Sequence, residues 1–421
     1  MFRFLHAADI HLDSPLHKLE GYEGAPVDEL RQATRRAFEN LVETAIREPV
    51  AFVLISGDLY DGDWRDYNTG LYFVSQMNRL KGAGIPVYLV SGNHDAASKI
   101  SKALRLPENV HLFPSKEPAT HTIEELGVAV HGRSFATPAV KEDLSIQYPS
   151  ALRGYFNIGM LHTCATGHEG HEPYAPCTLE GLQSKGYDYW ALGHVHQHQI
   201  LADDPPVLFP GNTQGRHIRE TGPKGCVIVS VEENGRTNWE FRPLDVIRWV
   251  LIHMDVSNAH TGYEVVDLFH DHLEKALHKN QGLPLVTRVV IKGNTDAHPE
   301  LASHLEQWTN EIRSVAADMS GASVWVEKVK FSTSPPLSHK DRVLSDGAIG
   351  ELVHLFEELR LNPDCLHDLA LELEDLGRKM PTELKEDPEG ILLNDPDWLE
   401  SILDQVQPML LERLIRKRDP E

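Results

Sequence analysis

Five short polar segments contain the side chains that could do chemistry in this chain. Each offers carboxylate, imidazole or amide groups, and each follows an apolar, β-rich run. The segments are Asp9-Ile10-His11, Gly57-Asp58-Leu59-Tyr60-Asp61, Gly92-Asn93-His94-Asp95, Leu161-His162-Thr163 and Gly193-His194-Val195-His196. Because they follow predicted strands, we expect these groups on strand-end loops, where α/β sheets place their binding and catalytic residues.

The spacing within two of these segments is suited to chelation. Side chains two residues apart in an extended chain point the same way, so Asp9 with His11, and His194 with His196, can each bind one centre from one side. Asp58 adds a carboxylate able to bridge two cations, and Asn93 adds a neutral carbonyl oxygen. The adjacent glycines let the backbone turn sharply without a Cβ clash.

The candidate metal ligands mix oxygen with imidazole nitrogen and include no thiolate. They are Asp9, His11, Asp58, Asn93, His162, His194 and His196. Such donors suit Mn²⁺, Fe or Zn²⁺ and argue against a cysteine-type structural zinc site. Two neighbouring divalent ions can clamp the attacking and leaving oxygens of a phosphoryl displacement. The pattern therefore predicts a hydrolase.

In their order along the chain, the five segments resemble the motifs of the calcineurin-like metallophosphoesterase family. Their spacing, the downstream segment PGNTQGR at 210–216 and the βαβαβ pattern are similar, more narrowly, to the bacterial SbcD-type DNA-repair exonuclease subunit. The resemblance implies two divalent ions, Mn²⁺ by preference, bridged by Asp58. It assigns one ion to Asp9, His11 and His196, and the other to Asn93, His162 and His194.

The resemblance also implies catalytic roles for two residues beside the ligands. His94 would contact the scissile phosphate and protonate or stabilise the leaving oxygen, without binding a metal. Asp61 matches the carboxylate that orients this histidine in family phosphatases. The chain departs from this pattern at two places. Some repair nucleases of this type have His at the position of Asp61. A glycine often follows the first motif, whereas this chain has Leu12 to Pro15 there.

The function implied is hydrolysis of phosphodiester bonds in DNA end processing and repair, by exonuclease or endonuclease action. The partners implied are DNA and an SbcC-type, SMC-like ATPase, and a homodimer is left open. A second α/β domain after residue 246 favours this interpretation, because a small-molecule phosphatase needs no such cap. The alternative is a metallophosphoesterase acting on nucleotides or phosphoproteins with the same metals.

Composition limits where and how such an enzyme could act. The formal net charge of −23 argues against free-standing electrostatic binding to nucleic acid. From Pro336 to Glu421 there are 21 acidic and 10 basic residues, a net of −11, so nearly half of the excess lies in the last fifth of the chain. Four scattered cysteines, the lack of a signal-peptide pattern and the lack of a membrane-spanning run predict a cytoplasmic protein.

The fold class predicted is α/β, with three regions. Residues 1–245 alternate strands and helices and then become strand-rich, as in a two-sheet metallophosphoesterase sandwich flanked by helices. Residues 246–333 form a small α/β capping domain, in which 298–315 is predicted as one helix. Residues 334–421 form an acidic helical region over 346–361, 366–379 and 397–416, whose apolar stripe either packs within the chain or binds a partner.

Several other residues have two interpretations. Cys164, His168, His171 and Cys177 match no common zinc pattern, so a mobile or substrate-contacting loop over 164–177 is favoured over a third metal site. Arg216, together with His217 and Arg219, could equally contact phosphate or carry surface charge. His6 and His131 lie within strand patterns and are predicted to be core or supporting residues.

Overall fold

The computed structural model describes residues 1–14, 27–61, 67–97, 105–165, 174–280, 282–320, 323–336 and 348–361, with separate positions between 373 and 410. The described chain divides into two compact units. One comprises Met1–Leu251, Glu274–Arg288 and Ala316–Lys328, and the other comprises Ile252–Leu273, Val289–Val315 and Val329–Glu421. All five motif segments lie in the first unit.

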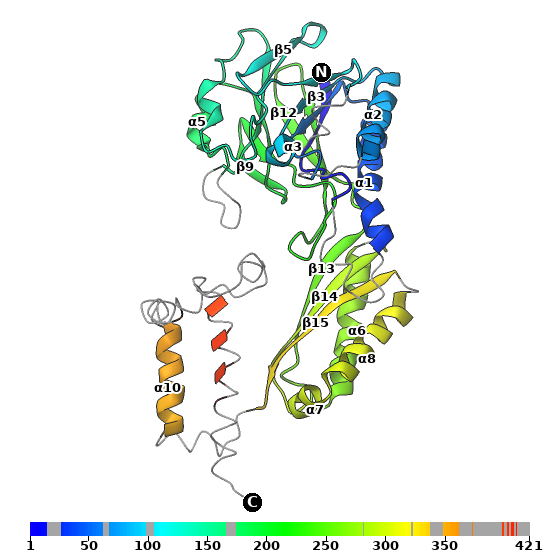
Figure 1. Ribbon diagram of the computed structural model, residues 1–421, viewed down its shortest axis with the longest axis vertical. Helices are drawn as coiled ribbons and strands as arrows, with labels where there is room; N and C mark the ends of the chain where they lie inside the picture. Colours follow the sequence, from blue (N-terminus) through cyan, green and yellow to red (C-terminus); the bar gives the residue numbers. More distant parts are fainter. Residues whose placement is uncertain are drawn as a thin grey trace, which may run out of the picture. The chain divides into compact units, whose positions relative to one another are not determined.

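Two six-stranded mixed sheets form the main body of the first unit (Figure 1). The first has the order β12-β11-β1-β2-β3-β4, with β1 (Phe2–Ala7), β2 (Phe52–Ser56), β3 (Val87–Val90), β4 (Val110–Leu112), β11 (Gly225–Val231) and β12 (Thr237–Pro243). The second has the order β5-β6-β7-β8-β10-β9, with β5 (Ala119–Ile123), β6 (Val128–Gly132), β7 (Phe156–His162), β8 (Tyr189–Gly193), β9 (Gln199–Asp203) and β10 (Pro206–Phe209). The predicted two-sheet sandwich is confirmed.

Strand alternation divides the apolar side chains between two layers of core. In β2, Phe52 and Leu54 pack between the sheets with residues of β7 and β8, whereas Val53 and Ile55 pack with helical residues. The described helices before β13 are α1 (Val27–Arg47), α2 (Tyr67–Gly82), α3 (Asn93–Ala97) and α5 (Leu179–Gln183), with 3₁₀ turns at Glu124–Leu126 and Leu144–Gln147. Because β1 to β4 are parallel, and β6, β7, β8 and β10 are parallel, several carboxyl ends meet at one edge of each sheet.

A third sheet has three strands in the order β13-β14-β15. The strands are β13 (Arg248–Asp255), β14 (Leu285–Asn294) and β15 (Val324–Ser334), and the helices between them are α6 (Gly262–Lys279), α7 (His298–Ser303) and α8 (Leu305–Ser320). The single helix predicted over 298–315 is wrong, because His304 leaves helical geometry with φ −135° and ψ 47° and separates α7 from α8.

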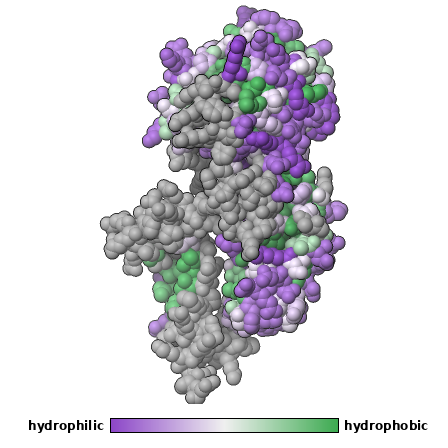
Figure 2. Space-filling model, turned by 45° about the vertical axis from the view of Figure 1, so that its right-hand side comes forward, coloured by the Kyte–Doolittle hydropathy of each residue, from purple (hydrophilic) through white to green (hydrophobic). Residues whose placement is uncertain are grey.

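The C-terminal region contains one described helix, α10 (Ala348–Leu361), in agreement with the prediction for 346–361. Its Phe356 is buried against Leu399 and Leu403. The helices predicted over 366–379 and 397–416 lie largely outside the described residues. Among the described helices, none is long and apolar enough to cross a membrane, and hydrophilic side chains predominate over the coloured surface on the face shown in Figure 2.

Candidate metal centre

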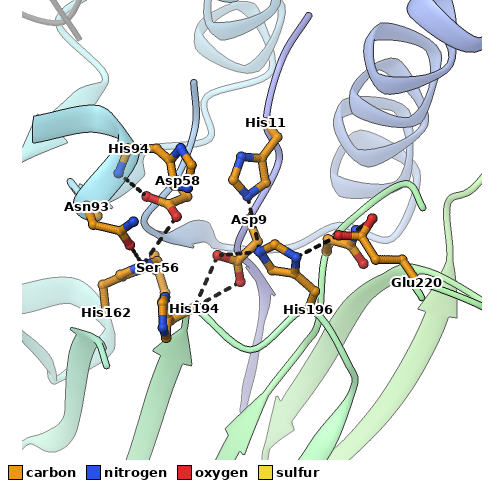
Figure 3. A network of polar contacts seen from close by, with 12 residues as sticks. Asp9, His11, Ser56, Asp58, Asn93, His94, His162, His194, His196 and Glu220 are labelled. Atoms are coloured by element: carbon orange, nitrogen blue, oxygen red, sulfur yellow. Dashed lines mark hydrogen bonds and ion pairs between the residues drawn. The ribbon is translucent and has the colours of Figure 1, made fainter. Parts of the chain in front are cut away.

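The predicted metal ligands converge at the carboxyl ends of strands from both sheets. Asp9 and His11 follow β1, Asp58 follows β2, and Asn93 follows β3 in the first sheet. In the second sheet, His162 is the last residue of β7, and His194 and His196 follow β8. Figure 3 shows these side chains pointing toward one another. The structure brings together all seven of the residues singled out as ligands.

The donor atoms form two clusters joined by Asp58. One atom from each of Asp9, His11 and His196 lies within 4.8 Å of the others, and the same holds for Asp58, His162 and His194. Asn93 joins the second cluster, with its Oδ1 3.0 Å from His162 Nε2. A further group within the same limit contains His11, Asp58 and His94, so Asp58 belongs to two groups.

Hydrogen bonds fix which ring nitrogen of His162 faces the cluster. Its Nδ1 lies 2.9 Å from the carbonyl oxygen of Ser56 and can only donate to that oxygen, which leaves Nε2 toward Asn93 and Asp58. The backbone N–H of His194 donates to both carboxylate oxygens of Asp9, at 3.1 and 3.0 Å. These bonds orient the donors before any ion binds.

The backbone at the site adopts conformations that side chains with a Cβ rarely take. Asp9, His11, Asp58 and His194 have φ values of 51°, 46°, 51° and 106°. Such left-handed or sparsely populated conformations cost on the order of 1–3 kcal/mol each and persist where the surrounding structure imposes them. Four of the seven predicted ligands therefore lie on strained backbone.

Three motif glycines are required by close approach of other atoms. A Cβ on Gly57 would lie 2.3 Å from His162 Nδ1, one on Gly92 would lie 2.2 Å from Asp58 Oδ1, and one on Gly193 would lie 1.9 Å from the Ser56 carbonyl oxygen. Only Gly57 of the three also has a positive φ, of 97°. The sharp backbone turn expected at these glycines is found at Gly57. Gly92 and Gly193 are required instead because neighbouring atoms leave no room for a Cβ.

The polar chemistry of the site fits divalent cations. Asp58 Oδ2 and His11 Nδ1 are buried without a hydrogen-bond partner, which is costly for a polar atom unless an ion or water contacts it. Burial lowers the pKa of His11 to about 3, so this imidazole is neutral and able to coordinate. Burial opposes protonation of His162, but the Asp58 and Asp9 carboxylates raise its pKa to about 9. Positive charge is thus most stable beside these two carboxylates, where a cation would supply it.

His94 is held by Asp61 at the edge of the clusters. Its Nδ1 lies 2.9 Å from Asp61 Oδ1, and the side chain is 38% exposed, in contrast to the buried donors around it. Burial alone would lower the pKa of His94, but the hydrogen bond to Asp61 and the charges of Asp58 and Asp61 outweigh it and raise this pKa. Ser14 Oγ donates to the other oxygen of Asp61.

Glu220, which the sequence analysis did not single out, and Arg216 support His196 and Asp61. Glu220 is buried, and its Oε1 lies 2.7 Å from His196 Nδ1. Arg216 contacts both Glu220 and Asp61, and its side chain is only 13% exposed. The interpretation of Arg216 as surface charge is therefore wrong. No spacing marks Glu220 in the sequence, because it meets His196 only through the loop after β10.

Asp95 was quoted in the third motif without a role and proves to join two motif loops. Its carboxylate accepts hydrogen bonds from the backbone N–H groups of Leu59 at 3.2 Å, Tyr60 at 2.9 Å and Gly92 at 3.1 Å. The loop that presents Asp58 and the loop that presents Asn93 are thereby tied together. The sequence signal that could have identified it is an acidic residue within the polar motif, directly after His94.

The remaining predicted positions are structural or lie outside the described residues. His6 is buried between Tyr189 and the Leu192 carbonyl oxygen, and His131 is buried beside Asn157, as predicted for core histidines. Cys164 and Cys177 are buried free thiols. His168 and His171 lie outside the described residues, as does most of the loop between the two cysteines.

A sandwich with two donor clusters at its strand ends defines a metal-dependent phosphoesterase, and comparison with known proteins agrees. Residues 2–198 match the family described as calcineurin-like phosphoesterase, and residues 249–334 match the middle domain of the metallophosphoesterase YhaO. The first match contains all five motif segments. The second covers the third sheet and its helices.

Two relatives show how far the likeness extends. An uncharacterized metallophosphoesterase, YhaO of Bacillus subtilis, is 36% identical over 69% of this chain and 71% of that protein. A DNA double-strand break repair protein, Mre11 of Methanopyrus kandleri, is 24% identical over 94% of this chain and 87% of that protein. The solved structure of a dimetal phosphatase from Danio rerio, at 13% identity, covers 58% of this chain and 96% of that chain with a TM-score of only 0.36.

The chain therefore belongs to the calcineurin-like metallophosphoesterases. It is a metal-dependent hydrolase of phosphoester bonds. Its relatives include YhaO and Mre11 proteins.

Proposed function

We propose that this protein is a cytoplasmic, two-metal DNA phosphodiesterase that processes DNA ends in repair as the SbcD-type partner of an SMC-like ATPase. The observation that carries the two-metal part is the pair of donor clusters joined by Asp58, with buried atoms on Asp58 and His11 that make no hydrogen bond. The likeness to the Mre11 protein of Methanopyrus kandleri, which is 24% identical over 94% of the chain, supports DNA as the substrate class. The mixed oxygen and nitrogen donors suit Mn²⁺, Fe or Zn²⁺. We expect Mn²⁺ among them because of the resemblance to SbcD-type nucleases.

Each side chain then has a stated task. Asp9, His11 and His196 would hold one ion and Asn93, His162 and His194 the other, with Asp58 shared between them. The two ions would supply Lewis acidity that stabilises charge on the phosphoryl group during displacement.

The chain itself supplies the proton for the leaving oxygen. Asp61 accepts from Nδ1–H of His94 at 2.9 Å, which fixes the ring and leaves Nε2 for the substrate. From there His94 protonates the leaving oxygen of the cleaved ester. Its exposure of 38% gives a polymeric substrate access that the buried donors lack.

Metal content and activity of an Asp58→Ala variant test the two-metal assignment. We expect the variant to bind one Mn²⁺ or none by elemental analysis and to lose hydrolysis of bis-p-nitrophenyl phosphate. Asp188→Ala is a matched control, because Asp188 accepts from the Asn157 backbone N–H where β7 and β8 begin, at the opposite ends of these strands from His162 and His194. Two retained ions with normal turnover in Asp58→Ala would refute the assignment.

The alternative function is hydrolysis of a second class of substrate at the same site. Hydrolysis of nucleotides or phosphoproteins is favoured by the net charge of −23, which opposes unaided binding to DNA. One experiment separates the DNA substrate from the alternative substrates. The protein is incubated with Mn²⁺, with and without the candidate ATPase, on end-labelled linear and hairpin duplexes, a nucleotide and a phosphopeptide. Cleavage of DNA under either condition supports the nuclease, and turnover of only the small substrates supports the alternative.

A further inference from the structure

Glu220 is a fixed hydrogen-bond acceptor behind His196. Its Oε1 lies 2.7 Å from His196 Nδ1, and its Oε2 accepts from Asn212 Nδ2 at 2.9 Å and from the Arg216 backbone N–H at 2.7 Å. The carboxylate is 4% exposed and cannot rotate without breaking these bonds. Figure 3 shows it on the side of the His196 ring opposite Asp9.

This contact determines the tautomer of His196. Arg216 Nη2, which can only donate, lies 3.2 Å from the same Nδ1, but the contact with the Glu220 carboxylate is shorter, at 2.7 Å. Nδ1 of His196 therefore donates to Glu220, and Nε2 is left with its lone pair. That Nε2 lies 3.2 Å from His11 Nε2 and 4.0 Å from Asp9 Oδ1, within the first donor cluster. Glu220 thus presents the nitrogen needed for metal binding toward the cluster.

Arg216 connects this carboxylate to the one that holds His94. Its Nη2 lies 2.9 Å from Glu220 Oε1, and its Nη1 lies 3.5 Å from Asp61 Oδ2. Asp61 in turn accepts from His94. A planar guanidinium with separated donors can span two carboxylates in this way, whereas a lysine ammonium is a point charge.

We infer that Glu220 and Arg216 are positioning residues that hold the metal-binding imidazole of His196 and the substrate-facing imidazole of His94 in one rigid frame. This inference rests on the proposed role of the site as a metal-dependent phosphodiesterase. Glu220 acts on metal affinity, through the tautomer and orientation of His196. Arg216 acts on turnover as well, because it also restrains Asp61 and, through it, His94.

The placement of Arg216 argues against a direct role in phosphate binding. Its guanidinium contacts Glu220, Asp61, the Ser14 hydroxyl and His196 Nδ1, and the side chain is 13% exposed. Turning it toward a substrate would leave two buried carboxylates without their counter-charge, which is strongly destabilising. A loss of substrate affinity alone is therefore not the expected effect of replacing it.

Metal affinity measured without turnover provides the first test. By titration calorimetry with Mn²⁺ alone, we expect Glu220→Ala to weaken binding about 10- to 100-fold, the usual effect of removing such a partner. Glu220→Gln can still accept from His196 through its amide oxygen, so it should recover part of the affinity. Arg216→Ala should weaken Mn²⁺ binding less than Glu220→Ala does.

Kinetics on bis-p-nitrophenyl phosphate at saturating Mn²⁺ provide the second test. We expect Arg216→Ala to lower kcat about 10-fold or more with little change in KM, because His94 loses its restraint while the substrate contacts remain. Arg216→Lys keeps the charge but cannot contact both Glu220 and Asp61, so its kcat should lie between those of Arg216→Ala and the wild type. A rise in KM with unchanged kcat would instead indicate direct phosphate binding and overturn the inference for Arg216.

A second buried ion pair offers matched controls. Arg288 and Glu327 form a two-point pair at 2.7 and 3.0 Å between β14 and β15. Arg288→Lys and Glu327→Gln make the same chemical changes in a comparable environment, and we expect them to lower thermal stability but leave Mn²⁺ affinity and kcat unchanged. If Arg216→Ala fails to fold, Arg216→Lys and Glu220→Gln retain the test.

The outcomes separate this inference from the proposed substrate. Folded Glu220 and Arg216 variants with wild-type Mn²⁺ affinity and kcat overturn the inference, whatever the substrate. If the wild type binds Mn²⁺ and cleaves the small diester but not DNA, the DNA proposal fails while the positioning roles remain measurable. Weakened Mn²⁺ binding in the Glu220 variants, absent from the Glu327 control, supports the inference.

Discussion

At the scale of single residues, the site combines strained backbone with unpaired buried polar atoms. Asp58 is the clearest case, with a φ of 51° and a carboxylate oxygen that is buried without a hydrogen bond. Each feature destabilises the folded chain by itself, and both would be relieved or offset by a bound cation. We therefore expect divalent ions to raise the melting temperature, since a ligand that binds only the folded state stabilises it.

His94 offers a separation of chemistry from metal binding. Because its Nδ1 is bonded to Asp61, His94→Asn should keep both ions while kcat on the small diester falls about 10²- to 10⁴-fold, the usual contribution of a general acid. Elemental analysis and steady-state kinetics measure the two effects. His270→Asn, an exposed histidine on α6, is the control. Loss of an ion from His94→Asn would show that His94 is a ligand within the His11 and Asp58 group.

The buried His6 predicts a pH dependence of stability. Burial, assisted by the charge of His198 and opposed by the Leu192 carbonyl, lowers its pKa from 6.5 to about 3. The unfolded chain therefore binds a proton at higher pH than the folded chain. His6 imposes no cost above about pH 6.5, and stability falls as the pH drops from there toward 3, by at most about 1.4 kcal/mol per unit.

Replacement of His6 by a neutral amide should remove this part of the pH dependence. His6→Gln can still accept from Tyr189 and donate to the Leu192 carbonyl. Urea unfolding at about pH 7 and about pH 5 should show a loss of stability in the wild type that exceeds the loss in His6→Gln by up to about 2 kcal/mol. His278→Gln, at an exposed position, should behave as the wild type does. Equal losses of stability in all three proteins would show that His6 does not cause this pH dependence.

Residue types and spacing were sufficient to predict seven side chains that the structure brings together, but not the residues that support them. Asp9 and His11 are two residues apart just after β1, so their chemistry is visible in the sequence. The extended backbone predicted for this pair is wrong, because both residues have positive φ values. Glu220 lies 24 positions after His196, and only the path of the chain after β10 brings the two together. Such contacts depend on tertiary structure, and no local pattern encodes them.

At the scale of secondary-structure elements, the strands and helices that were predicted are those with an apolar pattern. The strands β5, β9 and β12 lack such a pattern, because they form sheet edges and most of their side chains are half-buried or exposed. Edge strands have only one neighbour and need little continuous apolar surface. The sequence therefore indicated the centre of each sheet better than its borders.

Gly193 tests whether the two sheets must approach closely for the site to form. It ends β8, and a Cβ there would lie 1.9 Å from the Ser56 carbonyl oxygen at the end of β2. Gly193→Ala should force these strand ends apart, displacing His194 from Asp58. We expect a loss of Mn²⁺ affinity in calorimetry and a destabilisation of about 1–3 kcal/mol, as for other overpacked sites.

Gly82→Ala is the control for this substitution. Gly82 ends α2, and a Cβ there would meet no atom within 4 Å. The change should be neutral or stabilise the helix by up to about 1 kcal/mol. Gly193→Ala with wild-type metal affinity would mean that the strand ends can separate without disturbing the site.

At the scale of the whole molecule, negative charge is concentrated away from the predicted catalytic residues along the chain. All five motif segments precede residue 197, whereas residues 336–421 have a net charge of −11. Within this region, Phe356 of α10 packs with Leu399 and Leu403, so the interpretation of an apolar stripe buried within the chain is supported for this face. Leu355, on the same helix, is 51% exposed and available to a partner.

Deletion of residues 339–421 should therefore separate catalysis from assembly. The truncated protein retains both six-stranded sheets and all predicted ligands, so we expect Mn²⁺-dependent hydrolysis of the small diester to persist. Association with the SMC-like ATPase should be lost, because acidic helices with an apolar side chain exposed suit a protein groove better than DNA. Co-purification with a tagged ATPase, alongside the diester assay, measures both association and hydrolysis.

A point variant tests the same surface in the full chain. Leu355→Ser should weaken association with the ATPase, and Leu71→Ser, which changes an exposed leucine on α2, should not. Full ATPase binding by a soluble, active truncation would refute the partner surface, and an insoluble or inactive truncation would show that these helices complete the fold.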